Sequence, residues 1–105
     1  MRERDIEKVL VTEVRELGGR AYKWVSPGNA GVPDRIVIFP GQTPVFVELK
    51  AEGGTLTALQ EAQIARLEAL GQMVRVVRGM DGLSQFFQDM GYEDVSKALD
   101  CRYDL

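Results

Sequence analysis

Residues 31–50 read GVPDRIVIFPGQTPVFVELK, and this stretch decides the fold. It holds two short apolar runs, 36–39 and 45–49, which are rich in β-branched and aromatic residues and are separated by a turn-forming segment. This pattern predicts two antiparallel strands joined as a β-hairpin. Pro33 lacks a backbone N–H and belongs at the beginning of a strand, which places Asp34 at the opening of the first one.

The second strand carries a carboxylate and an amine on one face. Glu48 and Lys50 are two residues apart, and side chains at that spacing point the same way in a strand. A sheet covered on both faces would bury them in part, which is costly unless they are paired or bound to a metal ion. Together with Asp34, they offer the carboxylate oxygen ligands and the neighbouring amine that metal-assisted phosphodiester cleavage needs. Two plainer interpretations stay open: Asp34 only shapes the turn after Pro33, and Glu48 forms a simple salt bridge with Lys50.

Further elements are predicted on both sides of the hairpin. The apolar spacing over residues 5–17 predicts a helix that ends at two glycines, followed by a strand over 20–25 and a loop over 26–31. Beyond the hairpin we expect a helix capped by Thr55 or Thr57 and ended by Gly71. A strand over 73–78, parallel to the hairpin, a helix over 79–89 and a short helix over 95–101 complete the prediction.

The composition is that of one globular domain of 105 residues, with 45% hydrophobic and 28% charged residues. No apolar run approaches the roughly 20 residues that span a bilayer, and the start is no signal peptide, so we expect a cytoplasmic protein without a membrane partner. One cysteine and no histidine exclude an internal disulfide and a zinc-finger site. The net charge of −3 argues against tight nonspecific DNA binding over a broad basic face, although a bound cation would offset an acidic cluster.

Other candidate residues lie outside the hairpin. A helical wheel places two carboxylates, Glu7 and Glu3, beside the apolar stripe of the first helix, where each is either solvated or available to a site. Gln60, one turn into the second helix, either reaches back to a metal site or a phosphate or is an ordinary surface residue. Trp24 either stacks on a base or packs in the core or at a subunit interface.

Three segments and one glutamine carry a resemblance to a known family. They are YKWVSPG at 22–28, GVPDR at 31–35, FVELK at 46–50, and Gln60. With the element order, they resemble the virus-type replication-repair nuclease (VRR-NUC) domain of the PD-(D/E)XK nuclease superfamily, over residues 4 to about 87. The resemblance implies an α/β, restriction-endonuclease-like αβββαβ core with a mixed central sheet flanked by helices. We expect this core over about 4–90 of a single 1–105 domain, with 91–105 as a C-terminal extension.

The resemblance also implies roles for the candidate residues. The enzyme would be an endonuclease that uses Mg²⁺ or Mn²⁺ to hydrolyse DNA phosphodiesters. Lys50 would orient or activate the attacking water, and Gln60 would support the site. The implied metal ligands are carboxylates and one backbone carbonyl, those of Asp34, Glu48, Glu7 and Leu49, with Glu3 held as the alternative first-helix acid.

The expected partners are DNA and a second copy of the chain. Phosphate contacts are expected from Lys23, Arg35 and the loop residues Ser26 and Gly28. Small phage-like members are similar to Holliday-junction resolvases that act as homodimers, so branched DNA is the expected substrate. Two alternatives stay open: a non-catalytic DNA-binding or dimerisation module on the same scaffold, and a small α/β protein with only a structural Glu–Lys pair.

Overall fold

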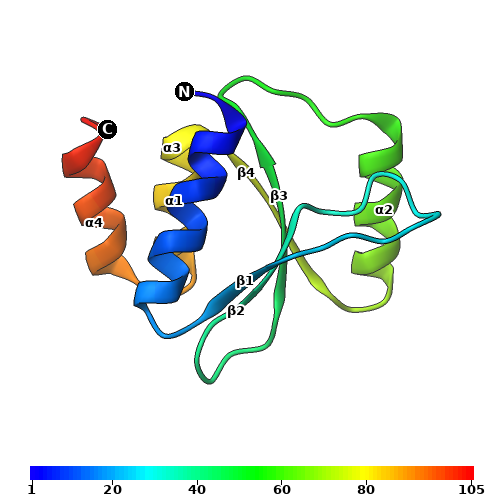
Figure 1. Cartoon of the computed structure of the whole chain (residues 1–105), viewed down its shortest axis with the longest axis horizontal. Helices are drawn as coiled ribbons and strands as arrows, with labels where there is room; N and C mark the ends of the chain where they lie inside the picture. The colour runs from blue at the N-terminus through cyan, green and yellow to red at the C-terminus, as the bar shows by residue number, and fades with distance from the viewer.

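A computed structural model describes residues 1–105 and shows one central sheet with helices on either side (Figure 1). The elements in chain order are α1 (Glu3–Glu16), β1 (Arg20–Lys23), β2 (Arg35–Ile38), β3 (Val45–Lys50), α2 (Ala58–Ala69), β4 (Met73–Arg78), α3 (Gly79–Asp89) and α4 (Glu93–Arg102). The predicted αβββαβ order of a mixed α/β fold is therefore confirmed. None of the helices combines the length and the apolar character that crossing a membrane requires.

The four strands form one sheet in the order β1-β2-β3-β4. The β1–β2 and β2–β3 pairs are antiparallel, and β4 runs parallel to β3 across the α2 crossover. The hairpin and the parallel pairing are thus confirmed. The first strand is shorter than predicted and ends at Lys23, because residues 24–34 leave the sheet as a loop and only the Trp24 N–H still reaches the Asp34 carbonyl, at 3.1 Å.

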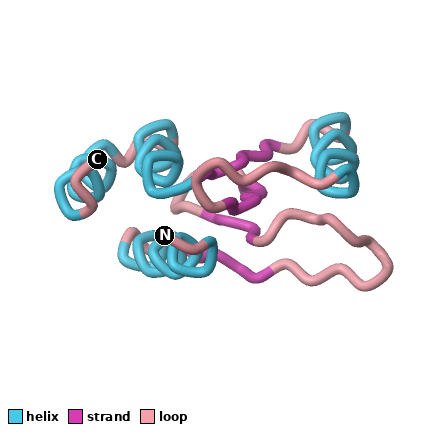
Figure 2. The backbone as a smooth tube through the Cα atoms, turned by 90° about the horizontal axis from the view of Figure 1, so that it is seen from above, coloured by secondary structure: helices cyan, strands magenta, loops and turns pink.

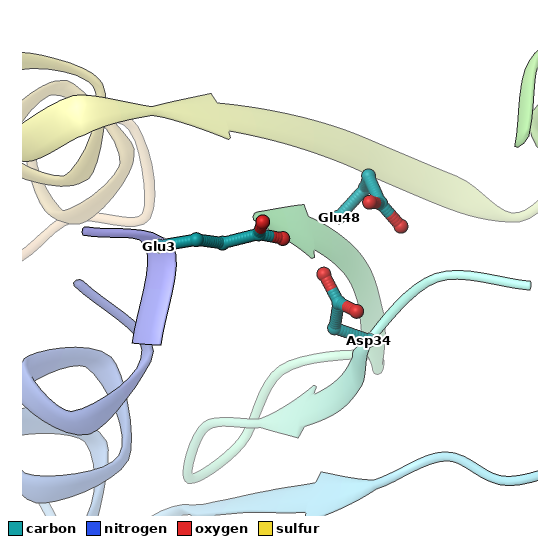
Figure 3. A group of neighbouring side chains, drawn as sticks. All are labelled: Glu3, Asp34 and Glu48. Carbon is teal, nitrogen blue, oxygen red and sulfur yellow. The ribbon is translucent and has the colours of Figure 1, made fainter. Parts of the chain in front are cut away.

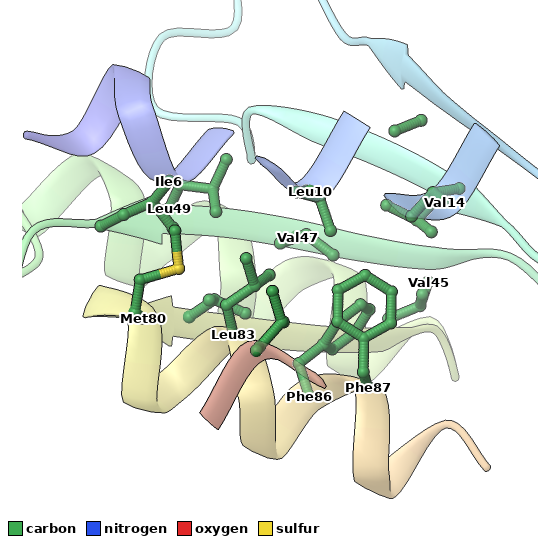
Figure 4. Packing of buried hydrophobic residues seen from close by; sticks show 14 of the residues in the cluster. Ile6, Leu10, Val14, Val45, Val47, Leu49, Met80, Leu83, Phe86 and Phe87 are labelled. Atoms are coloured by element: carbon green, nitrogen blue, oxygen red, sulfur yellow. The ribbon is translucent and has the colours of Figure 1, made fainter. Parts of the chain in front are cut away.

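The core lies between one face of the sheet and helices α1 and α3 (Figure 4). Leu10 of α1, Val47 of β3 and Phe86 of α3 are fully buried there. These residues alternate on the strands and recur every three or four positions on the helices, so each element contributes one apolar face. Helix α4 begins two residues earlier than predicted and packs on α3, and its Leu99 is also fully buried in this core.

The opposite face of the sheet is covered only by α2 (Figures 1 and 2). This helix is capped by Thr57, has no fully buried residue and packs against β4. The half-buried Trp24 lies on the same side, with its ring centroid 5.2 Å from that of Phe46. The indole therefore has a packing role.

Candidate active site

Asp34 and Glu48 converge because of the register of the hairpin. Arg35 pairs with Val47, and one further step of antiparallel pairing sets Asp34 opposite Glu48. Residues opposite each other in neighbouring strands project to the same face. The Leu49 N–H donates to Oδ2 of Asp34 at 2.8 Å and so fixes this carboxylate. In a strand the C=O of a residue points to the same side as its N–H, so the Leu49 carbonyl is also directed toward the strand that carries Asp34. Its role as a metal ligand stays a prediction.

A third carboxylate comes from the first turn of α1. Figure 3 shows Glu3 pointing from the helix start toward Asp34 and Glu48. One oxygen from each of the three lies within 4.8 Å of the others, which is a spacing at which one ion can be shared. Glu3 is exposed, Asp34 half-buried and Glu48 buried. We call these three residues the carboxylate cluster.

Glu48 is the most constrained member of the carboxylate cluster. Its Oε2 accepts a hydrogen bond from Gln60 Nε2 at 3.1 Å and lies 3.7 Å from Lys50 Nζ. Its Oε1 is buried without any hydrogen-bond partner. Burial above all, and then the charge of Asp34, raise the pKa of Glu48 to about 7, against the opposing charge of Lys50.

The surroundings of Glu48 fit a divalent cation. The salt bridge with Lys50 is present, as the plainer interpretation expected, but it leaves Oε1 of Glu48 unsatisfied. A buried carboxylate oxygen without a hydrogen-bond donor, beside two further carboxylates, is unfavourable even with Lys50 nearby, and a bound cation would offset this cost. Oxygen ligands of this kind suit Mg²⁺ or Mn²⁺, which need neither histidine nor cysteine.

Gln60 joins the start of α2 to the carboxylate cluster. Its side-chain Oε1 accepts a hydrogen bond from the Thr57 backbone N–H at 2.9 Å, and its backbone N–H donates to Thr57 Oγ1 at 3.2 Å. These two hydrogen bonds form a capping box. The side-chain nitrogen Nε2 of Gln60 donates to Oε2 of Glu48. The glutamine thus uses its oxygen for the helix and its nitrogen for the site, and the structure places it where it can support Glu48.

Glu7 does not join the carboxylate cluster. Its Oε2 accepts from Arg35 Nε at 2.8 Å and from Lys23 Nζ at 3.3 Å. Burial acts to raise the pKa of Glu7, but the hydrogen bond and charge of Arg35, helped by Lys23, outweigh it and lower the pKa below the ordinary value. Of the two first-helix acids, the structure brings Glu3 rather than Glu7 to Asp34. We therefore revise the preferred ligand from Glu7 to Glu3.

The four predicted phosphate contacts lie in two places. Lys23 and Arg35 lie against α1 through Glu7. Ser26 and Gly28 belong to the loop that extends toward α2 (Figure 1), where Ser26 Oγ accepts from an asparagine side chain at 2.9 Å and Gly28 has open space around it. A role of these residues in DNA binding stays a prediction.

Comparison with known proteins places this geometry in a family. No family model matches the chain. "Putative nuclease p44" of Acyrthosiphon pisum secondary endosymbiont phage 1 is 53% identical over 81 residues, which are 77% of this chain and 87% of that protein. A solved structure described as "VRR_NUC domain" superposes with a TM-score of 0.74 at 25% identity, covering 82% of this chain and 94% of that one. The chain belongs to the VRR-NUC family.

A second solved structure agrees on the fold of this VRR-NUC domain. It is described as "VRR_NUC domain protein" and has a TM-score of 0.66 at 17% identity, covering 84% of this chain and 86% of that one. The restriction-endonuclease-like α/β fold is confirmed by these likenesses together with the mixed sheet.

The sequence did not decide between Glu3 and Glu7 because the start of the first helix was hard to place. The helix was expected from Asp5, whereas α1 begins at Glu3, where the Arg2 N–H donates to the Asp5 carboxylate at 3.3 Å. An acidic residue at the third helical position was the available signal for this earlier start.

Proposed function

We propose that this VRR-NUC domain is a divalent-metal-dependent endonuclease that hydrolyses phosphodiester bonds in DNA. The observation that carries the proposal is the carboxylate cluster, with the unpaired Oε1 of Glu48 buried inside it and the amine of Lys50 beside it. Membership of a nuclease family supports the same reaction class.

The residues divide the work between holding an ion and placing the reacting groups. Glu3, Asp34 and Glu48 would hold Mg²⁺ or Mn²⁺, which when bound activates water and stabilises negative charge on the phosphate. Lys50, with a side chain only 13% exposed, would orient or activate the attacking water or stabilise charge on the phosphate oxygens. Gln60 holds Glu48, and the Leu49 N–H holds Asp34, so both ligands are oriented before any substrate binds.

The test compares cleavage by the wild type with cleavage by Asp34→Asn and Lys50→Ala. Labelled four-way junction, flap and plain duplex are incubated with each protein in Mg²⁺, in Mn²⁺ and in EDTA. We expect metal-dependent product from the wild type and a loss of at least about a hundredfold in both variants. The exposed Glu61→Gln on α2 is the matched control and should cleave normally. Cleavage in EDTA, or undiminished cleavage by Asp34→Asn, would contradict the proposal.

We further propose that the enzyme acts on branched DNA as a homodimer. A four-way junction has two-fold symmetry, and two copies of the site related by a two-fold axis match it. Exposed apolar side chains on the open face of β1 and β2 support a second copy: Tyr22 is 52% exposed and Ile38 is 38% exposed. Light scattering of wild type and Tyr22→Ser/Ile38→Ser, read beside junction cleavage, tests the assembly. A monomeric wild type that resolves junctions with full activity would contradict it, and junction binding without product would favour the non-catalytic module.

A further inference from the structure

Helix α1 presents a line of basic side chains on the side that faces away from the core. Arg4, Lys8 and Arg15 fall within about 40° of one another around the helix at 3.6 residues per turn. All three are exposed, and none of them takes part in the ion pairs of the structure. The buried residues of α1, such as Leu10, lie on the opposite side. This face therefore holds positive charges that the fold itself does not use.

The line of basic residues borders a hollow of about 670 Å³ along α1. We call it the α1 hollow. Five basic side chains line it, those of Arg2, Arg4, Lys8, Arg15 and Arg35, against the two acids Asp5 and Glu7. Both acids already have partners, because Asp5 lies 3.5 Å from Arg2 and Glu7 lies 2.8 Å from Arg35. The hollow is thus a positive region on a chain whose net charge is −3.

The α1 hollow and the carboxylate cluster meet at the start of α1, where Arg4 of the hollow follows Glu3 of the cluster in the chain. Arg35 of the hollow follows Asp34 in the same way, although the two side chains point to opposite faces of the sheet. From Arg4 to Arg15 the helix rises about 16 Å at 1.5 Å per residue. This length corresponds to about five phosphates of one strand of B-form DNA at 3.4 Å each.

We propose that the α1 hollow binds the phosphate backbone of the DNA next to the cleavage site. This proposal rests on the proposed nuclease function. Guanidinium and ammonium groups recognise phosphate oxygens without reading bases, so the contact is independent of sequence. It positions the strand next to the carboxylate cluster. The α1 hollow is a second phosphate-binding surface, separate from the loop over 26–31, which extends away from α1 toward α2 (Figure 1).

The test measures DNA binding as a function of salt in the Asp34→Asn background, in which the DNA stays intact. A fluorescein-labelled junction is titrated with this protein and with the additional double variant Lys8→Gln/Arg15→Gln. Each lost phosphate contact lowers the slope of log K against log salt by about 0.9, so the double variant should lower the slope by about 2 and weaken binding several-fold. Arg66→Gln/Lys97→Gln, which removes the same charge from α2 and α4, is the matched control and should change the slope little.

A gain of charge gives a second measurement. Thr12 lines the α1 hollow, and Thr12→Lys should increase the salt slope by about 1. Normal metal-dependent cleavage by the wild type, together with equal slopes for the Lys8/Arg15 variant and its control, would overturn this inference and leave the nuclease proposal intact. Absence of both cleavage and DNA binding in the wild type would overturn both.

Discussion

Glu48 is a buried ionisable residue whose carboxylate is only partly satisfied by the fold. The residue is 1% exposed, and its carboxylate receives one hydrogen bond from Gln60 and keeps Oε1 without a donor. The protonated form is favoured in the folded chain, since the pKa is about 7 instead of the usual value near 4.5. The ionised form of Glu48 therefore lowers the stability of the fold, and under the proposed function a bound cation would offset this cost.

The pH dependence of stability follows from the raised pKa of Glu48. A folded-state pKa above the unfolded one contributes stability that is complete below the unfolded pKa and is lost as the pH rises through about 7. We expect the melting temperature of the metal-free wild type to fall, relative to that of Glu48→Gln, between about pH 5 and pH 8. The difference corresponds to at most about 3 kcal/mol at pH 8. Thermal melts in EDTA measure it, and parallel pH profiles of the two proteins would contradict the burial of an ionisable Glu48.

Gln60 allows its two contacts to be separated by a conservative change. Gln60→Glu keeps an acceptor for the Thr57 N–H, so the capping box and α2 should remain. The donor to Glu48 is replaced by a carboxylate, which should reduce cleavage or metal affinity by about 10- to 100-fold, as loss of a ligand's supporting partner does. Circular dichroism checks the fold and single-turnover cleavage checks the site. Undiminished cleavage at unchanged metal affinity would show that this hydrogen bond has no functional part.

At the scale of elements, α1 does two separate things with two acids one turn apart. Glu3 belongs to the carboxylate cluster, whereas Glu7 connects the helix to β1 and β2 through Lys23 and Arg35. Arg35 also donates to the Ala21 carbonyl at 3.1 Å, so one guanidinium joins α1 to two strands. The same helix therefore carries one member of the carboxylate cluster and its own attachment to the sheet.

These two roles predict opposite phenotypes for isosteric changes. Glu3→Gln should weaken metal affinity at least about tenfold with little loss of stability. Glu7→Gln should lower stability by about 1–3 kcal/mol, because it leaves the 19%-exposed Arg35 without its charged partner. Since the pKa of Glu7 is lowered, this stabilisation is present above its unfolded pKa and is lost as the pH falls. Urea unfolding and metal titration of both variants measure the effects, and a reversed pattern would restore Glu7 as the ligand.

At the scale of the whole molecule, local patterns predicted most of the fold. Strand β4 and helix α3 have the bounds expected from sequence, 73–78 and 79–89, because the change of hydrophobic period occurs at a glycine. The convergence of Asp34 and Glu48 followed from a hairpin whose faces alternate strictly. Helix α2 was harder to predict, since Leu59 in the helix and Leu70 just after it are 59% and 75% exposed instead of packed. The choice of Glu3 depended on which turn of α1 reaches the hairpin, and that is a tertiary property that no single segment encodes.

The assembled site also predicts how the whole domain responds to its ion. Ligands from α1, the hairpin and, through Gln60, α2 come together only in the folded state, so binding should stabilise the fold by mass action. At about a hundred times the dissociation constant the gain is about 2.7 kcal/mol, or roughly 10 °C or more in melting temperature for a chain of this size. Thermal shift in Mg²⁺ or Mn²⁺ measures it, with Asp34→Asn as the control. An equal shift in both proteins would indicate binding elsewhere.

The position of Glu3 at the very start of α1 has a practical consequence for handling the protein. Helix ends fray, and the first turn holds no buried residue until Ile6, so Glu3 is the member of the carboxylate cluster that is most easily displaced. Affinity tags and fusion partners are therefore better kept away from the start of α1. An amino-terminal fusion could yield well-folded protein whose inactivity is an artefact of cloning.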